Sequence, residues 1–192
     1  MILDIFSRHV VGWLLAERES AELAEQLIAH TVSRHDVQAG MLTLHADRGA
    51  AMRSKPVAAL LVDLDITKSH SRPHVSDDNP YSESQFKTMK YRPDFPARFG
   101  CIKDARLHCQ EFFAWCNAEH RHSGIGYMTP QAVHYGHAQA LREALDAAFR
   151  AAPIRFKGQR PTPCDLPTAA WINAPASETI SPKSTSSCTA NS

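Results

Sequence analysis

Two carboxylates in the first half of the chain have the type and position that metal-dependent phosphate chemistry requires. Asp47 directly follows residues 41–46, an apolar run that predicts a strand, and Glu83 lies in the first turns of a helix that begins at Asn79-Pro80. Open α/β sheets bind ligands beyond the carboxyl ends of their strands, which is where Asp47 stands. The two positions differ by 36, so 35 residues intervene, enough to bring the helix back beside the strand end.

Two lysines share a helix face with the second carboxylate. Lys87 and Lys90 follow Glu83 at i+4 and i+7, which places the three side chains on one side of an α-helix. A carboxylate that holds a divalent cation beside lysines that meet phosphates would suit hydrolysis or transfer on a phosphate chain. Spacing alone leaves a simpler interpretation open, because Asp before Arg-Gly is ordinary turn chemistry and Glu with Lys at i+4 is an ordinary solvated pair.

The elements that must position these residues form an α/β pattern. Their order is β-β-α-β-α-β, which predicts helices packed on a mixed sheet, followed by a loop over 70–79 and then mostly helices. The Ser-rich and Thr-rich end, 176–192, is expected to be disordered. The predicted segments are strands 1–6 and 10–16, a helix capped by Ser20, strand 41–46, helix 54–64, strand 66–69, helix 79–91, a long helix through 102–116, a short one restarting at Thr129-Pro130 and another over 141–149.

Composition excludes several classes of protein. The chain has 192 residues, 43% of them hydrophobic and 21% charged, with a net charge of +1, which is a globular balance and not a polycation. It has no apolar run long enough to span a bilayer and no signal-peptide pattern, so we expect a cytoplasmic protein without a membrane partner. Five cysteines without C-x-x-C spacing favour free thiols over a disulfide framework or zinc site. The sequence has no glycine-rich phosphate-binding loop, so we expect no nucleotide cofactor.

Several motifs in the right order closely resemble one family, the transposases of bacterial insertion sequences in the IS-three group, whose core is similar to retroviral integrases. The resemblance extends over roughly residues 2–175. It rests on Leu3-Asp4-Ile5-Phe6-Ser7-Arg8 with Val10-Val11-Gly12-Trp13, on His45-Ala46-Asp47-Arg48-Gly49, on Ser69-His70-Ser71-Arg72-Pro73, on the segment from Asp78 to Tyr91, and on Trp115-Cys116-Asn117 followed by 120–125 and Thr129-Pro130.

The resemblance implies a ribonuclease H-like core that cuts and joins DNA with three acidic residues and two divalent ions, Mg²⁺ or Mn²⁺. Asp47 matches the second acid and Glu83 the third, so both are expected to be catalytic and to bind metal. Lys90 matches a basic residue expected to contact DNA near the transposon end. Lys87 and Arg92 extend this footprint, because residues 86–106 carry six basic and two acidic side chains, a net of +4. Asn79 and Ser82 are given supporting roles.

The sequence departs from the family pattern at its beginning. The first acid of the family lies upstream of the part matched by residues 2–13, and Asp4 belongs to a different motif, so we expect an N-terminally truncated core that lacks its first strand and has little activity. The predicted divisions are a partial catalytic core over 1–125, a helical and Pro-rich extension over 126–175, and the tail. DNA and a second transposase chain are the expected partners. A non-catalytic remnant that binds DNA or pairs with intact transposase, and a folded core without a DNA role, remain alternatives.

Overall fold

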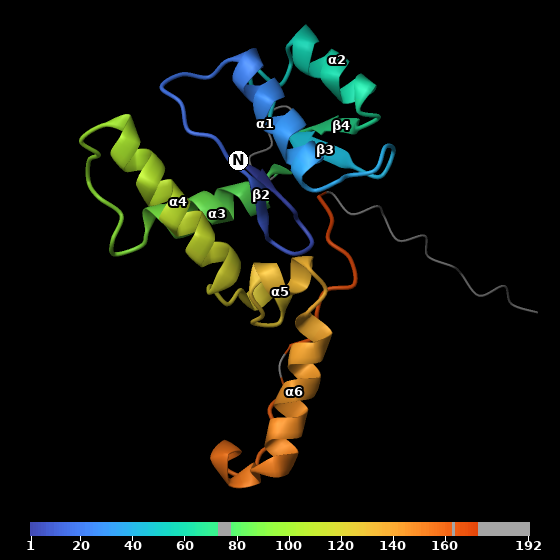
Figure 1. Ribbon diagram of the computed structural model, residues 1–192, viewed down its shortest axis with the longest axis vertical. Helices are drawn as coiled ribbons and strands as arrows, with labels where there is room; N and C mark the ends of the chain where they lie inside the picture. Colours follow the sequence, from blue (N-terminus) through green and yellow to red (C-terminus); the bar gives the residue numbers. More distant parts are fainter. Residues whose placement is uncertain (73–77, 163, 173–192) are drawn as a thin grey trace, which may run out of the picture.

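The computed structural model describes residues 1–72, 78–162 and 164–172, and it has the α/β order that the sequence predicts (Figure 1). The loop predicted over 70–79 lies partly, and the predicted tail wholly, outside these residues. The elements are β1 (Ile2–Leu3), β2 (Val10–Gly12), α1 (Ala21–Arg34), β3 (Thr43–Ala46), α2 (Lys55–Asp63), β4 (Thr67–His70), α3 (Pro80–Lys90), α4 (Ile102–Ala118), η2 (Ser123–Ile125), α5 (Pro130–His134), α6 (Ala138–Ala151) and η3 (Pro153–Phe156).

The N-terminal hairpin is much shorter than predicted. β1 and β2 pair antiparallel, but the prediction of strands over 1–6 and 10–16 is wrong in length. A side-chain-assisted turn ends β1, because Asp4 accepts the N–H of Phe6 at 3.0 Å and its backbone N–H donates to His9 at 2.9 Å. After Gly12 the chain leaves β2 and runs toward α4, where Arg106 donates to the carbonyl of Leu15 at 3.4 Å. Apolar character therefore did not mark strand length here, since residues 13–16 lie outside the ladder and Leu14 among them is exposed.

The strands predicted to form one mixed sheet form two separate two-stranded ladders, one antiparallel and one parallel. β3 and β4 pair in parallel from Thr43–Thr67 to Ala46–His70, with α2 as the crossover between them. In the described part of the chain this ladder shares no strand with the β1–β2 hairpin. Both ladders nevertheless contribute to one core, because Ile2 of β1 and Leu44 of β3 pack on the same cluster, formed by Ile28, Val57, Leu61 and Ile66 of α1, α2 and the start of β4.

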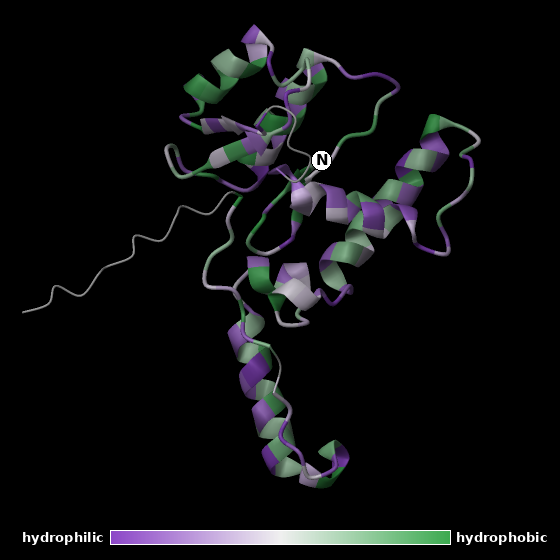
Figure 2. Cartoon of the chain, turned by 180° about the vertical axis from the view of Figure 1, so that it is seen from behind, coloured by the Kyte–Doolittle hydropathy of each residue, from purple (hydrophilic) through white to green (hydrophobic). Residues whose placement is uncertain are grey.

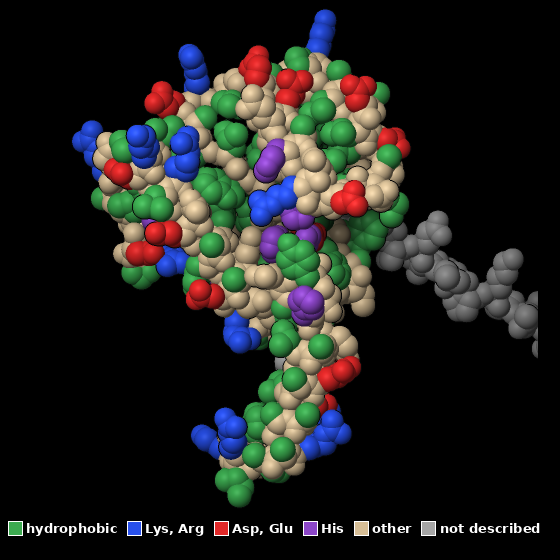
Figure 3. Space-filling model, viewed as in Figure 1, with side chains coloured by type: hydrophobic (Ala, Val, Ile, Leu, Met, Phe, Trp, Pro, Cys, Tyr) green, Lys and Arg blue, Asp and Glu red, His purple; other side chains and the backbone are tan. Residues whose placement is uncertain are grey.

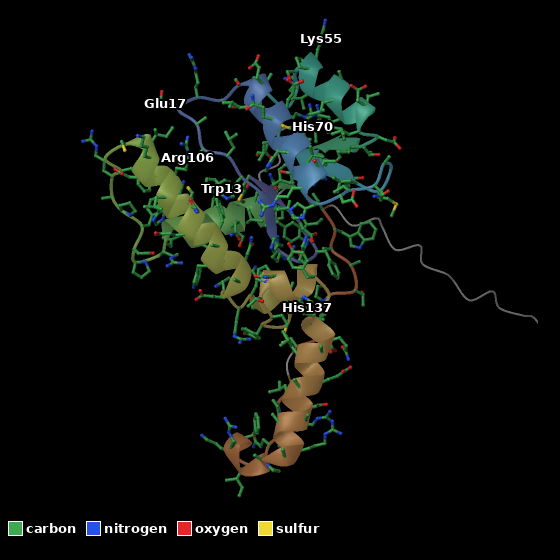
Figure 4. All side chains as sticks on the ribbon, in the orientation of Figure 1. Trp13, Glu17, Lys55, His70, Arg106 and His137 are labelled. Atoms are coloured by element: carbon green, nitrogen blue, oxygen red, sulfur yellow. The ribbon has the colours of Figure 1, made fainter. Side chains whose placement is uncertain are left out.

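A second core joins β2, α3 and α4. Phe112, Phe113 and Cys116 of α4 pack against Val10 of β2, which confirms the predicted apolar face of the long helix. The buried Gln85 of α3 donates to the sulfur of Cys116 at 2.9 Å. An open cleft lies between α4 and the connection from β2 to α1, and its lining includes Trp13, Glu17 and Arg106 (Figure 4).

The C-terminal helices are where the sequence predicts them. α5 is capped by Thr129, whose hydroxyl accepts the N–H of Ala132 at 3.3 Å. Ile125, Met128, Val133 and Ala138 form a third cluster, which packs η2, α5 and the start of α6 together.

Beyond this cluster α6 projects from the body, with mixed polar and apolar colouring along its length (Figures 1 and 2). Two ion pairs join α6 to the residues that follow η3: Arg160 pairs with Asp146, and Arg142 with Asp165. None of the helices in the described ranges is long and apolar enough to cross a membrane.

Candidate active site

Asp47 lies immediately beyond the last residue of β3, and its side chain is exposed. One of its oxygens, Oδ1, accepts the hydroxyl of Ser71 at 3.0 Å and the side-chain amide of Asn79 at 3.3 Å. Ser71 directly follows β4, the parallel neighbour of β3, and Asn79 is the N-cap of α3. The carboxyl ends of both strands and the start of α3 therefore converge on Asp47.

A histidine behind Asp47 ties these three elements together. His45 on β3 contacts the hydroxyl of Ser69 on β4 through Nδ1 at 2.8 Å and the carbonyl of Asp78 through Nε2 at 3.0 Å. Since a carbonyl can only accept, Nε2 carries the proton, and the Ser69 hydroxyl then donates to Nδ1. Asp78 is itself 1% exposed and accepts hydrogen bonds from the guanidinium and backbone N–H of Arg72. This network fixes where α3 begins relative to the sheet.

Glu83 stands one turn into α3, exposed, and it is connected to Asp47 through a single residue. The backbone N–H of Glu83 donates to the carbonyl of Asn79 at 3.2 Å, and the amide side chain of Asn79 donates to Asp47. Among the described residues, no cluster of three or more His, Cys, Asp or Glu side chains has a metal-binding arrangement. The structure thus brings the ends of β3 and β4 to the first turn of the helix that carries Glu83.

The two predicted lysines and the predicted arginine have different surroundings. Lys87 and Lys90 are exposed on the last turns of α3. Arg92 forms a two-point ion pair with Asp94, at 2.7 and 2.8 Å, and its guanidinium lies 4.1 Å from the ring centre of Trp115. Its charge is therefore already engaged within the molecule, and its role in DNA binding stays a prediction. Lys and Arg side chains on the face drawn in Figure 3 are scattered among acidic ones and form no single basic patch.

Asp4 lies in a different environment from the two candidate acids. Its carboxylate accepts from Ser7 and contacts Nδ1 of His134 at 3.0 Å, which joins the β1–β2 turn to α5. Burial by itself would raise the pKa of Asp4, but the hydrogen bonds with His134, Ser7 and the Phe6 N–H outweigh burial and lower that pKa to about 2. The side chain therefore stabilises the turn.

Sequence reasoning missed the residues that support the acids. His45, Ser69, Ser71 and Asp78 all lie within the quoted motifs, but the spacing along the chain gave no sign that they hydrogen-bond with one another. Ser71 and Asp78 lie near the two ends of the predicted loop, so the useful signal was their position directly after β4 and directly before the N-cap of α3. Asn79, given only a supporting role, contacts Asp47 together with Ser71.

Two family comparisons now decide the class of this core. Residues 1–76 match the integrase core domain, and residues 64–130 match a second profile of the same description, so that together they account for residues 1–130. Residues 1–130 of this chain therefore belong to the integrase-core family. Its relatives place it with insertion-sequence transposases, and the narrower IS-three assignment stays a prediction.

The integrase-core relatives are longer than this chain. The transposase for insertion sequence element IS904 of Lactococcus lactis subsp. lactis (strain IL1403) is 29% identical over 133 residues, 67% of this chain and 51% of the relative. The probable transposase for insertion sequence element IS1353 of Shigella flexneri is 25% identical over 147 residues, 73% of this chain and 27% of the relative. The chain thus spans about half, or less, of the length of these relatives.

The integrase-like fold is also seen in solved structures. The crystal structure of the catalytic core domain of BIV integrase aligns with a TM-score of 0.52 and 19% identity, covering 72% of this chain and 85% of that one. This likeness confirms the ribonuclease H-like fold class. Integrase-core enzymes use divalent metals, and the exposed carboxylates of Asp47 and Glu83 are the hard oxygen donors that Mg²⁺ and Mn²⁺ prefer. The donor chemistry therefore fits such an ion.

Proposed function

We propose that this chain supplies the DNA-cutting and strand-joining core of an insertion-sequence transposase, with Asp47 and Glu83 as its metal-binding catalytic acids. The observation that carries the proposal is the contact of Asp47 with Asn79, the N-cap of the helix on which Glu83 stands. A transposase that acts on chromosomal DNA would work in the cytoplasm, as the sequence predicts.

Asp47 and Glu83 would hold Mg²⁺ or Mn²⁺, which supplies Lewis-acid charge stabilisation at a reacting phosphate. The protein's own contribution is positional. Ser71 and Asn79 both donate to one oxygen of Asp47, which orients that carboxylate and leaves its other oxygen for a cation. His45 supports the same strand end through Ser69 and Asp78.

The DNA would lie along the exposed side of α3. Lys87 and Lys90 occupy the turns that follow Glu83, so phosphates on either side of the reacting one can meet an ammonium group. Such contacts fix the position of the DNA and carry no sequence information. Arg92 would act on the same footprint by holding the loop after α3 through Asp94 and Trp115.

The absence of a third metal-binding side chain around these acids, in the part of the chain that the structure describes, favours weak activity. Two carboxylates offset the charge of two dications less well than three. A second candidate function follows from this observation: a non-catalytic partner that binds DNA or pairs with an intact transposase. As part of this proposal, residues 1–125 form the partial catalytic core and residues 126–175 form its C-terminal extension.

The test is Mn²⁺-dependent cleavage and joining of labelled terminal-repeat DNA, measured beside DNA binding. We expect tight binding with slow, Mn²⁺-dependent cleavage that Asp47→Asn and Glu83→Gln abolish. Asp63→Asn, an exposed acid at the end of α2, is the matched control and should leave cleavage unchanged. Binding without any cleavage would favour the second candidate, and a chain that neither binds nor cleaves DNA would refute the proposal together with the DNA-binding form of the second candidate.

A further inference from the structure

A small cavity of about 250 Å³ lies beside α3, on a face next to the one that carries Glu83. It is formed by the β1–β2 turn, the first turns of α3 and the segment after α4, three parts of the chain that are distant in sequence. Its lining includes Leu3, Arg8, Tyr81, Ser84, Gln85 and His122. Among the residues that the structure describes, no carboxylate belongs to this lining.

Arg8 reaches the cavity from a backbone conformation that an arginine rarely adopts. Its φ is +64°, in the left-handed region, and the turn holds it there because its N–H donates to the carbonyl of Asp4 at 2.8 Å. The guanidinium stacks over the ring of Tyr81 at 4.0 Å and donates to the carbonyl of Ile5. Within the described ranges no acidic side chain pairs with it, and its buried Nε has no hydrogen-bond partner.

His122 offers a second donor to the same cavity. Its Nδ1 accepts the backbone N–H of Gly124 at 3.0 Å, so the neutral ring carries its proton on Nε2. Burial lowers the pKa of His122, and the positive charges of Arg8 and His120 lower it further. The ring is thus a neutral N–H donor beside an arginine without a carboxylate partner, which is a set of groups that an anion would satisfy.

We propose that Arg8, Ser84 and His122 bind one phosphate of the DNA backbone. The inference rests on the proposed function and adds a second contact with the DNA backbone to the one proposed for Lys87 and Lys90. Because Ser84 directly follows Glu83 on α3, this phosphate lies on the face next to the one that Glu83, Lys87 and Lys90 share. DNA is then held along two adjacent faces of α3.

Arg8→Gly is the sharpest test, because glycine adopts a positive φ without strain and keeps the fold while it removes the guanidinium. Binding of a short fluorescent DNA duplex is measured by anisotropy over a range of KCl concentrations. We expect affinity to fall about tenfold and the salt slope to decrease by about 0.9, the value for one lost phosphate contact. Arg18→Gly, an exposed arginine in the loop before α1, is the matched control and should change neither quantity.

His122→Gln provides a second variant if Arg8→Gly does not fold; it should weaken binding several-fold with little change in salt slope, because a neutral donor is lost. Unchanged affinity and slope in a folded Arg8→Gly, or in His122→Gln where Arg8→Gly does not fold, would overturn the phosphate site. The proposed function has its own readout, because Lys90→Gln would still weaken binding in that case. Failure of the unmodified chain to bind DNA would instead reject the proposed function itself.

Discussion

His9 should make the stability of the fold fall as the solution becomes acidic. Its ring is 8% exposed, stacks face to face on His134 at 4.5 Å, and has a buried Nδ1 with no hydrogen-bond partner in the described part of the chain. Burial lowers the pKa of His9 to about 4 from 6.5, helped by the positive charges of His134 and His35. The change to test is His9→Phe, which keeps an aromatic ring against His134 and cannot titrate.

The sign and size of the effect follow from proton binding. The unfolded chain takes up a proton on His9 near pH 6.5, whereas the folded chain does so only near pH 4, so the unfolded state gains protons first as pH falls. The pKa difference, 6.5 − 4, or about 2.5, corresponds to roughly 3 kcal/mol over the whole window. Between about pH 7 and about pH 4.5 this one side chain should remove about 2 kcal/mol of unfolding free energy.

Urea unfolding followed by far-UV circular dichroism at these two pH values measures the effect. We expect the fall in unfolding free energy to be about 2 kcal/mol smaller in His9→Phe than in the unmodified chain. Other titrating groups are the same in both proteins, so the difference isolates His9. His30→Gln, an exposed histidine on α1, should behave like the unmodified chain. Equal falls in His9→Phe and the unmodified chain would refute the assignment of this acid sensitivity to His9.

Three further substitutions test the packing and the caps. Gly12→Ala should cost roughly 1–3 kcal/mol, because its Cβ would lie 2.1 Å from the hydroxyl of Thr31, and the partner change Thr31→Ala should restore much of that loss in urea unfolding. Ser20→Ala should cost about 1 kcal/mol, because the hydroxyl accepts the N–H of Leu23 in the first turn of α1 at 3.2 Å; an unchanged midpoint would contradict this role. Asp78→Ala should cost about 1 kcal/mol, because the buried carboxylate accepts the backbone N–H of Arg72 at 2.6 Å, whereas a neutral result in thermal unfolding would show that this contact does not stabilise the start of α3.

Helices were predicted well because their signals are local. Ser20 and Ser54 cap α1 and α2 as expected, and Pro80 opens α3. The spacing of apolar residues along α4 correctly identified the face that packs on Val10. Strands β3 and β4 also lie within a few residues of their predicted positions, because turn residues end them.

The pairing and length of strands were harder, because they depend on contacts that are distant in sequence. Residues 13–16 are apolar, but they leave the ladder to line the cleft against α4 instead of extending β2. The same limit applies to Arg92: charge and position favoured a DNA contact, while its ion pair with Asp94 and its stacking on Trp115 depend on the path of the loop after α3.

The site itself was predictable only in part. The motifs predicted Asp47 and Glu83 as the acids, which stays a prediction, and their relation depends on Asn79 contacting Asp47, 32 residues earlier in the chain. The supporting roles of Ser71 and His45 are likewise set by the parallel pairing of β3 with β4. Local sequence therefore identified the candidate chemical groups, and tertiary contacts determined how they are oriented.

Calorimetric titration of Mn²⁺ into the chain and its variants tests the central claim most directly. If Asp47 and Glu83 bind one cation together, Asp47→Asn and Glu83→Gln will each weaken Mn²⁺ binding at least tenfold. The double variant will then bind Mn²⁺ little more weakly than either single variant. Mn²⁺ binding that is unaffected by both single changes, or that weakens additively as if at two independent sites, would contradict the account.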